Sequence, residues 1–479
     1  MADDYAYAST IDTAAAIRGG AVSSTELLEA ALARVARLDG PINAVVRLDE
    51  EQARAAARAA DEAVAAGDKL GPLHGVPITI KDSFQTKGLI TTSGAPELAD
   101  FVPERDAAPV ARYRDAGAVI FGKTNLPIWA GDTQSYNQVY GTTSNPYDIE
   151  RTPGGSSGGS GAALAAGYTP LELGSDIGGS IRIPTHMSGV AGHKPSYGVV
   201  NAHGQIPGMP GTLSLADIAV AGPMARTVDD LEMALDLLAG PDEWNSTAYS
   251  LNLPPARHTD VASFRIGAWW DEPSCPIDAD TRAALEATAT ALSSAGATVD
   301  LGARPEIQFD KAVLAFEQLL SAAESGSWSL AELDEIAKDP DPQGTLGITF
   351  AAMRHRQWLS ANERRLQQRA RWHEYFKSWD AILLPVTSTP GFPHDHSRPV
   401  SMRRLQVDDT DIPYFHMIRW MGLTGVAYLP ATVVRVGTSR DGMPIGIQIA
   451  GPFLEDRTTL QLARHIEQLM GGFERPAGF

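Results

Sequence analysis

Three residues of this chain have the types needed for nucleophilic chemistry: Lys81, Ser156 and Ser180. Each serine lies inside a glycine-rich cluster, and the two serines are 24 residues apart. Glycine lets the backbone bend sharply and bring its N–H groups close to a ligand. A serine that ends such a turn can therefore combine a nucleophile with donors for an oxyanion. Because serine needs a base to attack an amide, the pattern predicts a serine hydrolase in which Lys81 replaces histidine.

The first glycine-rich cluster covers residues 154–161 and contains Ser156. Its composition is also that of a flexible linker. It runs directly into the alanine-rich stretch 162–166, however, which predicts a helix of small residues followed by a strand. Glycines that open a helix present free N–H groups at its start. We therefore interpret the cluster as part of a site.

The second cluster, Gly174–Ser180, ends on the candidate nucleophile. The structural alternative is an ordinary turn between a strand and a helix. We predict that four N–H groups converge on one point and hold an oxyanion, those of Ile177, Gly178, Gly179 and Ser180. Removing one such donor typically costs about 10²–10³ in rate, so this loop would contribute strongly to catalysis.

The candidate base, Lys81, directly follows the apolar run Val76–Ile80, which predicts a strand. An isolated lysine at a strand end usually reaches solvent. Burial would instead favour the neutral amine, which can accept a proton. The pKa would have to fall by about three units, or roughly 4 kcal/mol. Shifts of this size are known for buried lysines.

Short apolar runs alternate with helical segments in the first half of the chain, which favours an α/β sheet with helices on both faces. Helices are expected after the capping-box pattern at Ser23–Glu26 as far as about Arg37, and from about Glu50 to Ala65. Further strands and helices are expected at Ala118–Phe121, Leu171–Leu173, Ala107–Arg114 and Val228–Leu238.

The middle third, residues 278–379, is predicted to be helical and less regular. Strands are expected again at Ala381–Pro385, Ala431–Val436 and Ile445–Ile449, with a closing helix near Thr458–Met470. We expect these last strands to rejoin the first sheet.

Three motifs in the chain suggest other chemistries. Gly117–Thr124 fits the phosphate-loop pattern, but its middle residues are typical of a strand where a loop is required. Gly154–Gly158 fits the nucleophile elbow, but a polar segment ending in Pro153 precedes it where a strand is required. His394 and His396 could ligate a metal, yet we expect them on a solvent-exposed loop because nothing completes a metal site. No metal or cofactor is expected.

The composition restricts the class of protein. The net charge of −19 argues against nucleic acid as a partner. No apolar run is long enough to span a membrane, and the N-terminus does not have the pattern of a secretory signal. The single cysteine, Cys275, excludes an intramolecular disulfide and a cysteine metal cluster. A cytoplasmic protein without nucleic acid or membrane partners is expected.

Five segments together resemble the amidase signature family: Pro72–Asp82, Gly154–Ala163, Gly174–Pro184, Gly192–Pro195 and Pro444–Gln448. The likeness covers nearly the whole chain and is weakest between about 250 and 420. It implies an α/β fold with a large twisted mixed β-sheet covered by helices on both faces. We expect one domain over 1–479, with a catalytic core at 70–240 and a helical substrate-pocket insertion at 278–379.

The resemblance also implies roles for individual residues. Ser180 matches the family's nucleophile, Ser156 its bridging serine after a cis peptide bond, and Lys81 its base. The resemblance assigns Ser157, Asp176 and Arg182 to supporting the glycine loops, and Ala130, Gly131, Asp132 and Thr133 to the acyl pocket.

The activity expected is hydrolysis of a small or aryl carboxamide, with esters and carbamates as related substrates, by a monomer or homodimer. Aromatic residues favour this interpretation, namely Phe316, Trp328, Phe350, Trp358 and Trp420, although most are expected to be core. One alternative is the glutaminase subunit of a tRNA-dependent amidotransferase, although Tyr197–Gly204 departs from the run usual in that subfamily. A non-catalytic scaffold of the same fold is the other.

Overall fold

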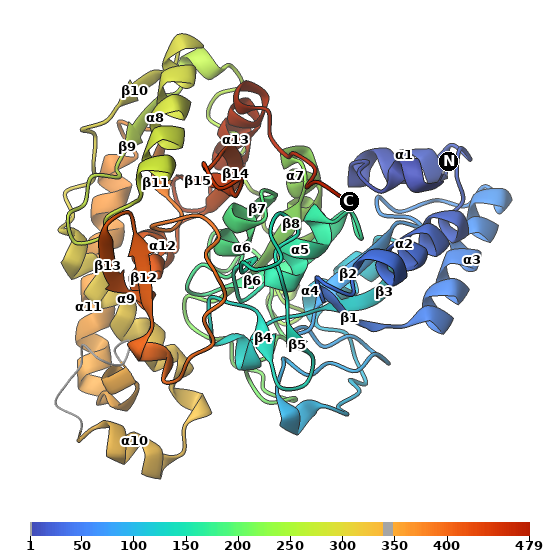
Figure 1. The fold of residues 1–479 in the computed structure, drawn as a ribbon, viewed down its shortest axis with the longest axis horizontal. Helices are drawn as coiled ribbons and strands as arrows, with labels where there is room; N and C mark the ends of the chain where they lie inside the picture. Colours follow the sequence, from blue (N-terminus) through green and yellow to red (C-terminus); the bar gives the residue numbers. More distant parts are fainter. Residues whose placement is uncertain (1, 339–347) are drawn as a thin grey trace.

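The computed structural model describes residues 2–338 and 348–479. Its largest element is a mixed sheet with strand order β10-β9-β11-β15-β14-β7-β8-β6. These strands are β6 (Leu171–Asp176), β7 (Ala191–Lys194), β8 (Val220–Ala225), β9 (Arg265–Ala268), β10 (Thr298–Asp300), β11 (Ala381–Pro385), β14 (Ala431–Thr438) and β15 (Pro444–Ala450). The C-terminal strands β14 and β15 lie in the middle of the sheet, and β14 pairs with β7, so the last strands rejoin strands from the first half of the chain as the sequence predicted (Figure 1).

Helices cover both faces of this sheet, which confirms the predicted fold class. One face packs against α7 (Val228–Leu238), α8 (Ala279–Ser294) and α13 (Asp456–Met470). The other face packs against the short helices α5 (Gly158–Ala165) and α6 (Arg182–Met187). Side chains alternate between the faces, so Val434 joins the first core cluster while Val433 joins a second.

The strand that ends at Lys81 lies outside the large sheet. It is β2 (Pro77–Lys81), and it forms a three-stranded sheet with β1 (Val45–Leu48) and β3 (Val119–Thr124), in the order β1-β3-β2. Strand β2 meets β6 through side chains, because the Thr79 hydroxyl donates to the Glu172 carboxyl. A strand pattern in the sequence gives no information about which sheet the strand joins, so only the structure separates the two.

The small sheet lies near one end of the molecule, together with α1 (Thr10–Arg18), α2 (Ser24–Leu38) and α3 (Glu50–Ala66) (Figure 1). Helices α2 and α3 pack against this sheet, whereas α1 and α4 (Ala108–Asp115) contact α7. The capping box predicted for α2 is present, since Ser23 and Glu26 each accept a backbone N–H of the other. The remaining predicted strands and helices are also observed, with ends shifted by a few residues.

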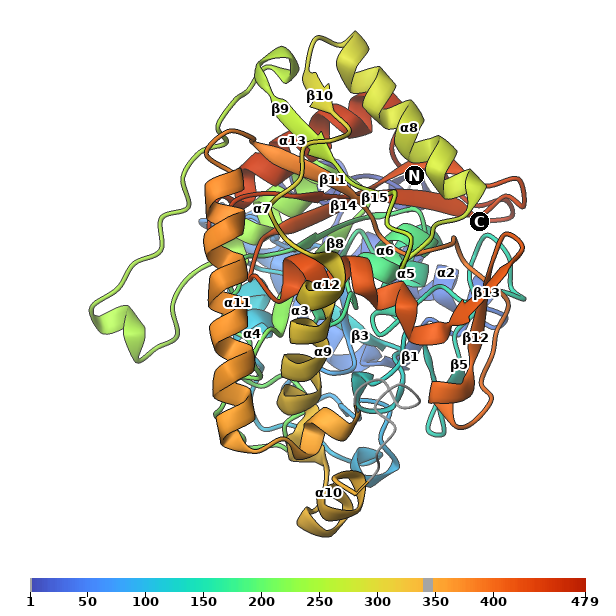
Figure 2. The ribbon, with the colours of Figure 1, turned by 90° about the vertical axis from the view of Figure 1, so that its left-hand side faces the viewer.

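The middle third is less uniform than predicted, because it contains the edge strand β10 and the sheet-covering helix α8. Beyond them, α9 (Phe309–Glu324), α10 (Leu330–Ile336) and α11 (His355–Tyr375) stand with α12 (Arg419–Gly425) at the opposite end from α1–α3 (Figure 1), and this end faces the viewer in Figure 2. Two hairpins complete the fold, β4 (Tyr136–Asn137) with β5 (Gly141–Thr142) and β12 (Arg404–Val407) with β13 (Thr410–Pro413). Among the described residues, no helix combines the length and apolar character needed to cross a membrane.

Candidate active site

Lys81 ends β2 inside the protein, where its side chain is fully buried. Its Nζ lies 2.7 Å from Ser156 Oγ, 2.9 Å from Ser157 Oγ and 3.0 Å from Ser175 Oγ. The lysine therefore contacts both glycine-rich clusters at once. The alternative of a strand-end lysine reaching solvent is wrong for this residue.

These three hydroxyl partners fit a neutral amine. A neutral lysine has two N–H groups and one lone pair, so it can donate to two hydroxyls and accept from the third. Burial lowers the pKa of Lys81 to about 7, although the charges of Asp176 and Glu172 raise it. A large fraction of the amine is then unprotonated near neutral pH, and its lone pair can accept the proton of Ser156.

Ser156 follows a cis peptide bond between Gly155 and Ser156. A Cβ atom on Gly155 would lie 2.7 Å from the carbonyl carbon of Thr133, so only glycine fits at this position. The next N–H group, that of Ser157, donates to the Ser180 carbonyl oxygen at 3.1 Å. The two glycine clusters are thus joined directly, at the residue next to Ser156.

Ser180 ends the loop between β6 and α6, and it is 9% exposed. The sequence predicted four oxyanion donors on this loop, but the Gly179 N–H donates to Asp176 Oδ1 at 2.9 Å. Gly179 is therefore corrected to a structural position. Among the residues that the structure describes, no acceptor is found for the N–H groups of Ile177, Gly178 and Ser180, so these three donors are unpaired.

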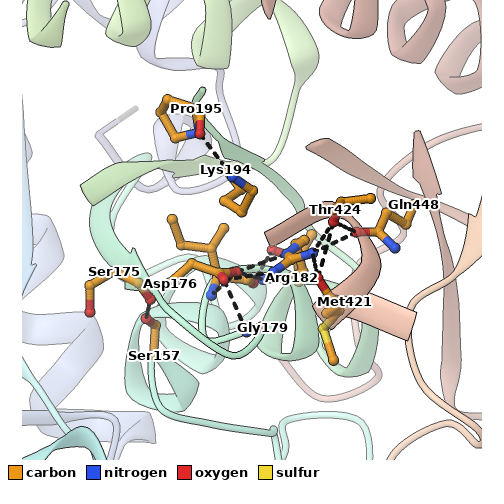
Figure 3. A network of polar contacts seen from close by, with 12 residues as sticks. Ser157, Ser175, Asp176, Gly179, Arg182, Lys194, Pro195, Met421, Thr424 and Gln448 are labelled. Atoms are coloured by element: carbon orange, nitrogen blue, oxygen red, sulfur yellow. Dashed lines mark hydrogen bonds and ion pairs between the residues drawn. The ribbon is translucent and has the colours of Figure 1, made fainter. Parts of the chain in front are cut away.

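The loop is held by a buried ion pair between Asp176 and Arg182, with Arg182 Nη2 2.8 Å from Asp176 Oδ1 (Figure 3). Burial alone raises the pKa of Asp176, but the adjacent Arg182 guanidinium brings it down to about 2. Arg182 Nη1 also donates to Met421, Thr424 and Gln448, at 3.2, 2.8 and 2.6 Å. The pair therefore fixes this loop, residues 177–181 (the oxyanion loop of the prediction), to α12 and β15.

Replacing Arg182 by methionine is expected to lower the free energy of unfolding by about 3–5 kcal/mol, because it leaves the Asp176 carboxylate buried and unpaired. The matched control is Arg440→Met, which breaks an ion pair with Asp280 that is largely exposed on the arginine side. That change is expected to cost much less, because solvent screens the exposed pair. Urea unfolding of both variants compares the two values, and equal losses would contradict the structural role of Arg182.

The four predicted pocket residues differ in accessibility. Ala130 is half-buried and Gly131 is exposed, whereas Asp132 and Thr133 are buried. Asp132 forms an ion pair with Arg403, and Thr133 donates to the Tyr414 hydroxyl. The side chains of Asp132 and Thr133 therefore face the protein, and this segment meets the Ser156 loop through its backbone.

Two residues of the site were not predicted. Ser175 contacts Lys81, and Ser135 Oγ donates to the Gly154 carbonyl oxygen at 3.0 Å and accepts the Gly158 N–H at 3.0 Å. Ser175 stands inside the second glycine cluster, so its place on β6 was a usable signal. Nothing in the sequence around Ser135 indicates its contact with the first cluster.

The motifs for other chemistries are explained by the structure. Lys123 of the phosphate-loop pattern lies in β3, where its buried Nζ donates to the Phe84 carbonyl and the Thr86 hydroxyl. The 394–396 segment is a loop, as predicted, but it is half-buried and not solvent-exposed, because His396 stacks on Tyr136. No cluster of metal-ligating side chains is found within the described residues.

Most of the aromatic residues proposed for the pocket are core or surface. Phe316 and Trp420 are fully buried, and Trp328 is exposed. Side chains of α12 and the turn before it contact the oxyanion loop instead. Met421 Sδ occupies the space that a Cβ atom on Gly179 would need. The atom nearest to a Cβ on Gly178 would belong to the Ile418 side chain. The side chains beside Gly178 and Gly179 are thus apolar.

This geometry agrees with comparisons to known proteins. A family model described as Amidase matches residues 26–460. One relative is a component of the glutamyl-tRNA(Gln) amidotransferase of Acidothermus cellulolyticus. It is 33% identical over 490 residues, which cover 95% of this chain and 93% of that protein.

Two solved structures are also similar to this chain over nearly its whole length. One is described as a vestigial protein complex that reveals the origins of an s-triazine catabolic enzyme; it has a TM-score of 0.83, 29% identity, and coverage of 98% of this chain and 99% of that one. A 6-aminohexanoate cyclic dimer hydrolase has a TM-score of 0.80 and 26% identity, with the same shares of the two chains covered.

Proposed function

The chain belongs to the amidase signature family, and we propose that it hydrolyses the C–N bond of a carboxamide through an acyl-enzyme on Ser180. One observation carries the proposal: the buried Lys81 amine contacts Ser156, whose loop is joined to that of Ser180. A neutral base, a bridging hydroxyl and a hydroxyl beside free N–H donors are the groups that acyl transfer needs.

The proposed reaction begins when Lys81 takes the proton of Ser156 while Ser156 takes that of Ser180. Ser180 Oγ attacks the carbonyl carbon, and the N–H groups of Ile177 and Gly178, with that of Ser180 itself, hold the oxyanion. The proton returns through Ser156 to the leaving nitrogen as the C–N bond breaks. Water then attacks the ester by the same relay, releases the carboxylic acid and restores the Ser180 hydroxyl.

The site supports an uncharged substrate. Its charged side chains are paired with one another, Asp176 with Arg182 and Asp132 with Arg403. The side chains next to the oxyanion loop, Ile418 and Met421, are apolar. We therefore propose a small or aryl carboxamide as substrate class, with esters and carbamates as further substrates because they present the same carbonyl group.

A second candidate is a glutaminase that supplies ammonia within an amidotransferase. It is favoured by the 33% identity to a component of a glutamyl-tRNA(Gln) amidotransferase. In that case the chain would work with other protein chains. Glutamine carries an ammonium and a carboxylate beside its amide, and both need counter-charges when they are buried. The comparisons therefore support this second candidate, whereas the pairing of Asp176 with Arg182 on the Ser180 loop supports the first.

Substrate preference separates the two candidates. We expect the purified chain to hydrolyse apolar p-nitroanilides with a kcat/KM at least about 10²-fold above that for glutamine, because glutamine would leave two buried charges unpaired. Release of p-nitroaniline and of ammonia measures the two rates. Glutamine turnover above anilide turnover, or activity that requires the other components of an amidotransferase, would support the second candidate instead.

A scaffold without catalytic activity gives a different result again. A fluorophosphonate reacts with an activated serine and adds its mass to that residue. An adduct on Ser180 excludes the scaffold, whereas its absence from folded protein would contradict the proposed acyl-enzyme.

The state expected for the active protein is a monomer or homodimer.

A further inference from the structure

A buried polar cluster joins the segment before β4 to the hairpin formed by β12 and β13. At its centre, Arg403 Nη1 lies 2.8 Å from Asp132 Oδ2, and the two side chains are 0% and 6% exposed. Arg403 directly precedes β12, while Asp132 lies in the segment that borders the Ser156 loop. The ion pair therefore links two segments that are far apart in the sequence.

The Asp132 carboxylate has all its acceptor positions filled by protein. Oδ1 accepts the Tyr414 hydroxyl at 2.8 Å and the Thr133 N–H at 2.7 Å. Oδ2 accepts from Arg403 and from the Tyr136 hydroxyl at 3.1 Å. A carboxylate with four donors is saturated, so Asp132 has no capacity left for a substrate group.

Each of the three guanidinium nitrogens of Arg403 also donates a hydrogen bond within this cluster. Its Nε donates to the Ser397 carbonyl oxygen at 2.8 Å, and its Nη2 donates to the Tyr136 hydroxyl at 2.6 Å. The planar guanidinium thus fixes three groups at once in defined directions, which the point charge of a lysine cannot reproduce. The cluster is rigid on the hairpin side and on the Asp132 side.

This rigid cluster lies directly against the loop that carries Ser156. A Cβ atom on Gly155 would lie 2.8 Å from the Asp132 carbonyl oxygen and 2.7 Å from the Thr133 carbonyl carbon. Ser135, in the same segment, bonds the loop on both sides of Ser156, at Gly154 and Gly158. Any displacement of Asp132 is therefore transmitted to the bridging serine.

We infer that Arg403 is a positioning residue for Ser156, acting through Asp132 and the backbone of residues 132–135. Its guanidinium holds this segment against the cis peptide bond, so that the Ser156 hydroxyl stays aligned between Lys81 and Ser180. The inference rests on the proposed acyl transfer to Ser180. It assigns to the hairpin a role in the reactivity of the nucleophile that is separate from substrate contact.

The test compares Arg403→Met, Arg403→Lys and the control Arg404→Met. Arg404 is the neighbouring residue, and its ion pair with Asp411 is exposed. The readouts are the second-order rate of fluorophosphonate labelling of Ser180, kcat and KM for a p-nitroanilide, and the thermal midpoint. Labelling reports the reactivity of Ser180 without depending on the identity of the natural substrate.

We expect Arg403→Met to label Ser180 about 10²-fold more slowly at temperatures where the variant is folded, since a misplacement of about 1 Å has effects of that size. The loss should appear in kcat and leave KM largely unchanged. Arg403→Lys keeps the charge but loses the fork geometry, so a loss of about tenfold is expected. Arg404→Met should stay within about twofold of wild type.

A purely structural role would lower the thermal midpoint and leave the labelling rate of the folded variants at the wild-type value, which would overturn the inference. If Arg403→Met does not fold, a wild-type rate in Arg403→Lys overturns it equally. Wild-type protein that is not labelled at all contradicts the proposed acyl-enzyme and the inference with it. Labelled wild type with unchanged variants contradicts the inference alone.

Discussion

Replacing Ser180 by alanine is expected to lower kcat for amide hydrolysis by about 10⁴–10⁶-fold, because no acyl-enzyme can form without the nucleophile. The oxyanion donors and the substrate contacts remain, so KM should change little and a small rate above that of water should persist. Steady-state turnover of a p-nitroanilide measures the loss. Intact-protein mass spectrometry after fluorophosphonate treatment should show no adduct on the variant.

A matched control for this change is Ser188→Ala. Ser188 is fully buried and directly follows α6, and its hydroxyl only donates to the Pro153 carbonyl oxygen at 3.4 Å. Turnover in this variant should stay within about threefold of wild type, since a long hydrogen bond contributes little. If Ser180→Ala kept anilide turnover while Ser156→Ala abolished it, the nucleophile would be Ser156 and the proposed order of proton transfers would be wrong.

Replacing Lys81 by methionine is expected to lower kcat/KM by about 10²–10⁴-fold, the usual contribution of a general base. Methionine fills much of the same buried volume but has no lone pair that could take the proton of Ser156. The control is Lys69→Met, a change of the same type at an exposed lysine, which should leave kcat/KM unaltered. Equal activity of Lys81→Met and wild type would contradict the assignment of the base.

The pH dependence follows from the same residue. Only the neutral amine can act as base, and burial lowers the pKa of Lys81 to about 7. Below that pH, kcat/KM of the wild type should fall about tenfold per pH unit, and above it the activity should level off. The residual activity of Lys81→Met should lack this acidic limb, that is, the fall of kcat/KM below about pH 7. A wild-type limb centred near pH 10 would mean that the amine is not desolvated in solution.

Stability should respond to pH with a definite sign. Lys81 binds its proton more weakly in the folded state than in the unfolded state, where lysine has a pKa near 10.5. Between about pH 7 and 10 the unfolded chain therefore holds more protons at this residue, so its contribution to the free energy of unfolding rises with pH. The difference between wild type and Lys81→Met, measured by urea unfolding at several pH values, isolates this contribution. A difference that falls with rising pH would contradict it.

Local elements were predictable from the sequence. The helix after Ser23 was predicted because a capping box satisfies backbone N–H groups within four residues of each other. The strand before Lys81 and a closing helix near Thr458–Met470, observed at Asp456–Met470, were predicted because their apolar residues recur at the period of a strand or a helix. Such signals are local and average over several residues. They therefore locate the body of an element correctly and its ends only to within a few residues.

The order of amino acids was enough to identify the residue types of the site and the flexible backbone around them. A lysine after a strand and two serines among glycines are the residues proposed as base, relay and nucleophile. The glycines are required wherever backbones touch, as at Gly155 against Thr133. The family to which the chain belongs could be proposed on this basis.

How these groups meet, and in which protonation state, depends on the folded chain. Folding places Lys81 in a separate sheet, beside Ser175, and directs the Gly179 N–H to Asp176, which removes one predicted oxyanion donor. It also pairs Asp132 with Arg403 across 271 positions of the chain. Desolvation and ion pairing depend on everything that packs around a group, and residues distant in sequence supply most of that packing.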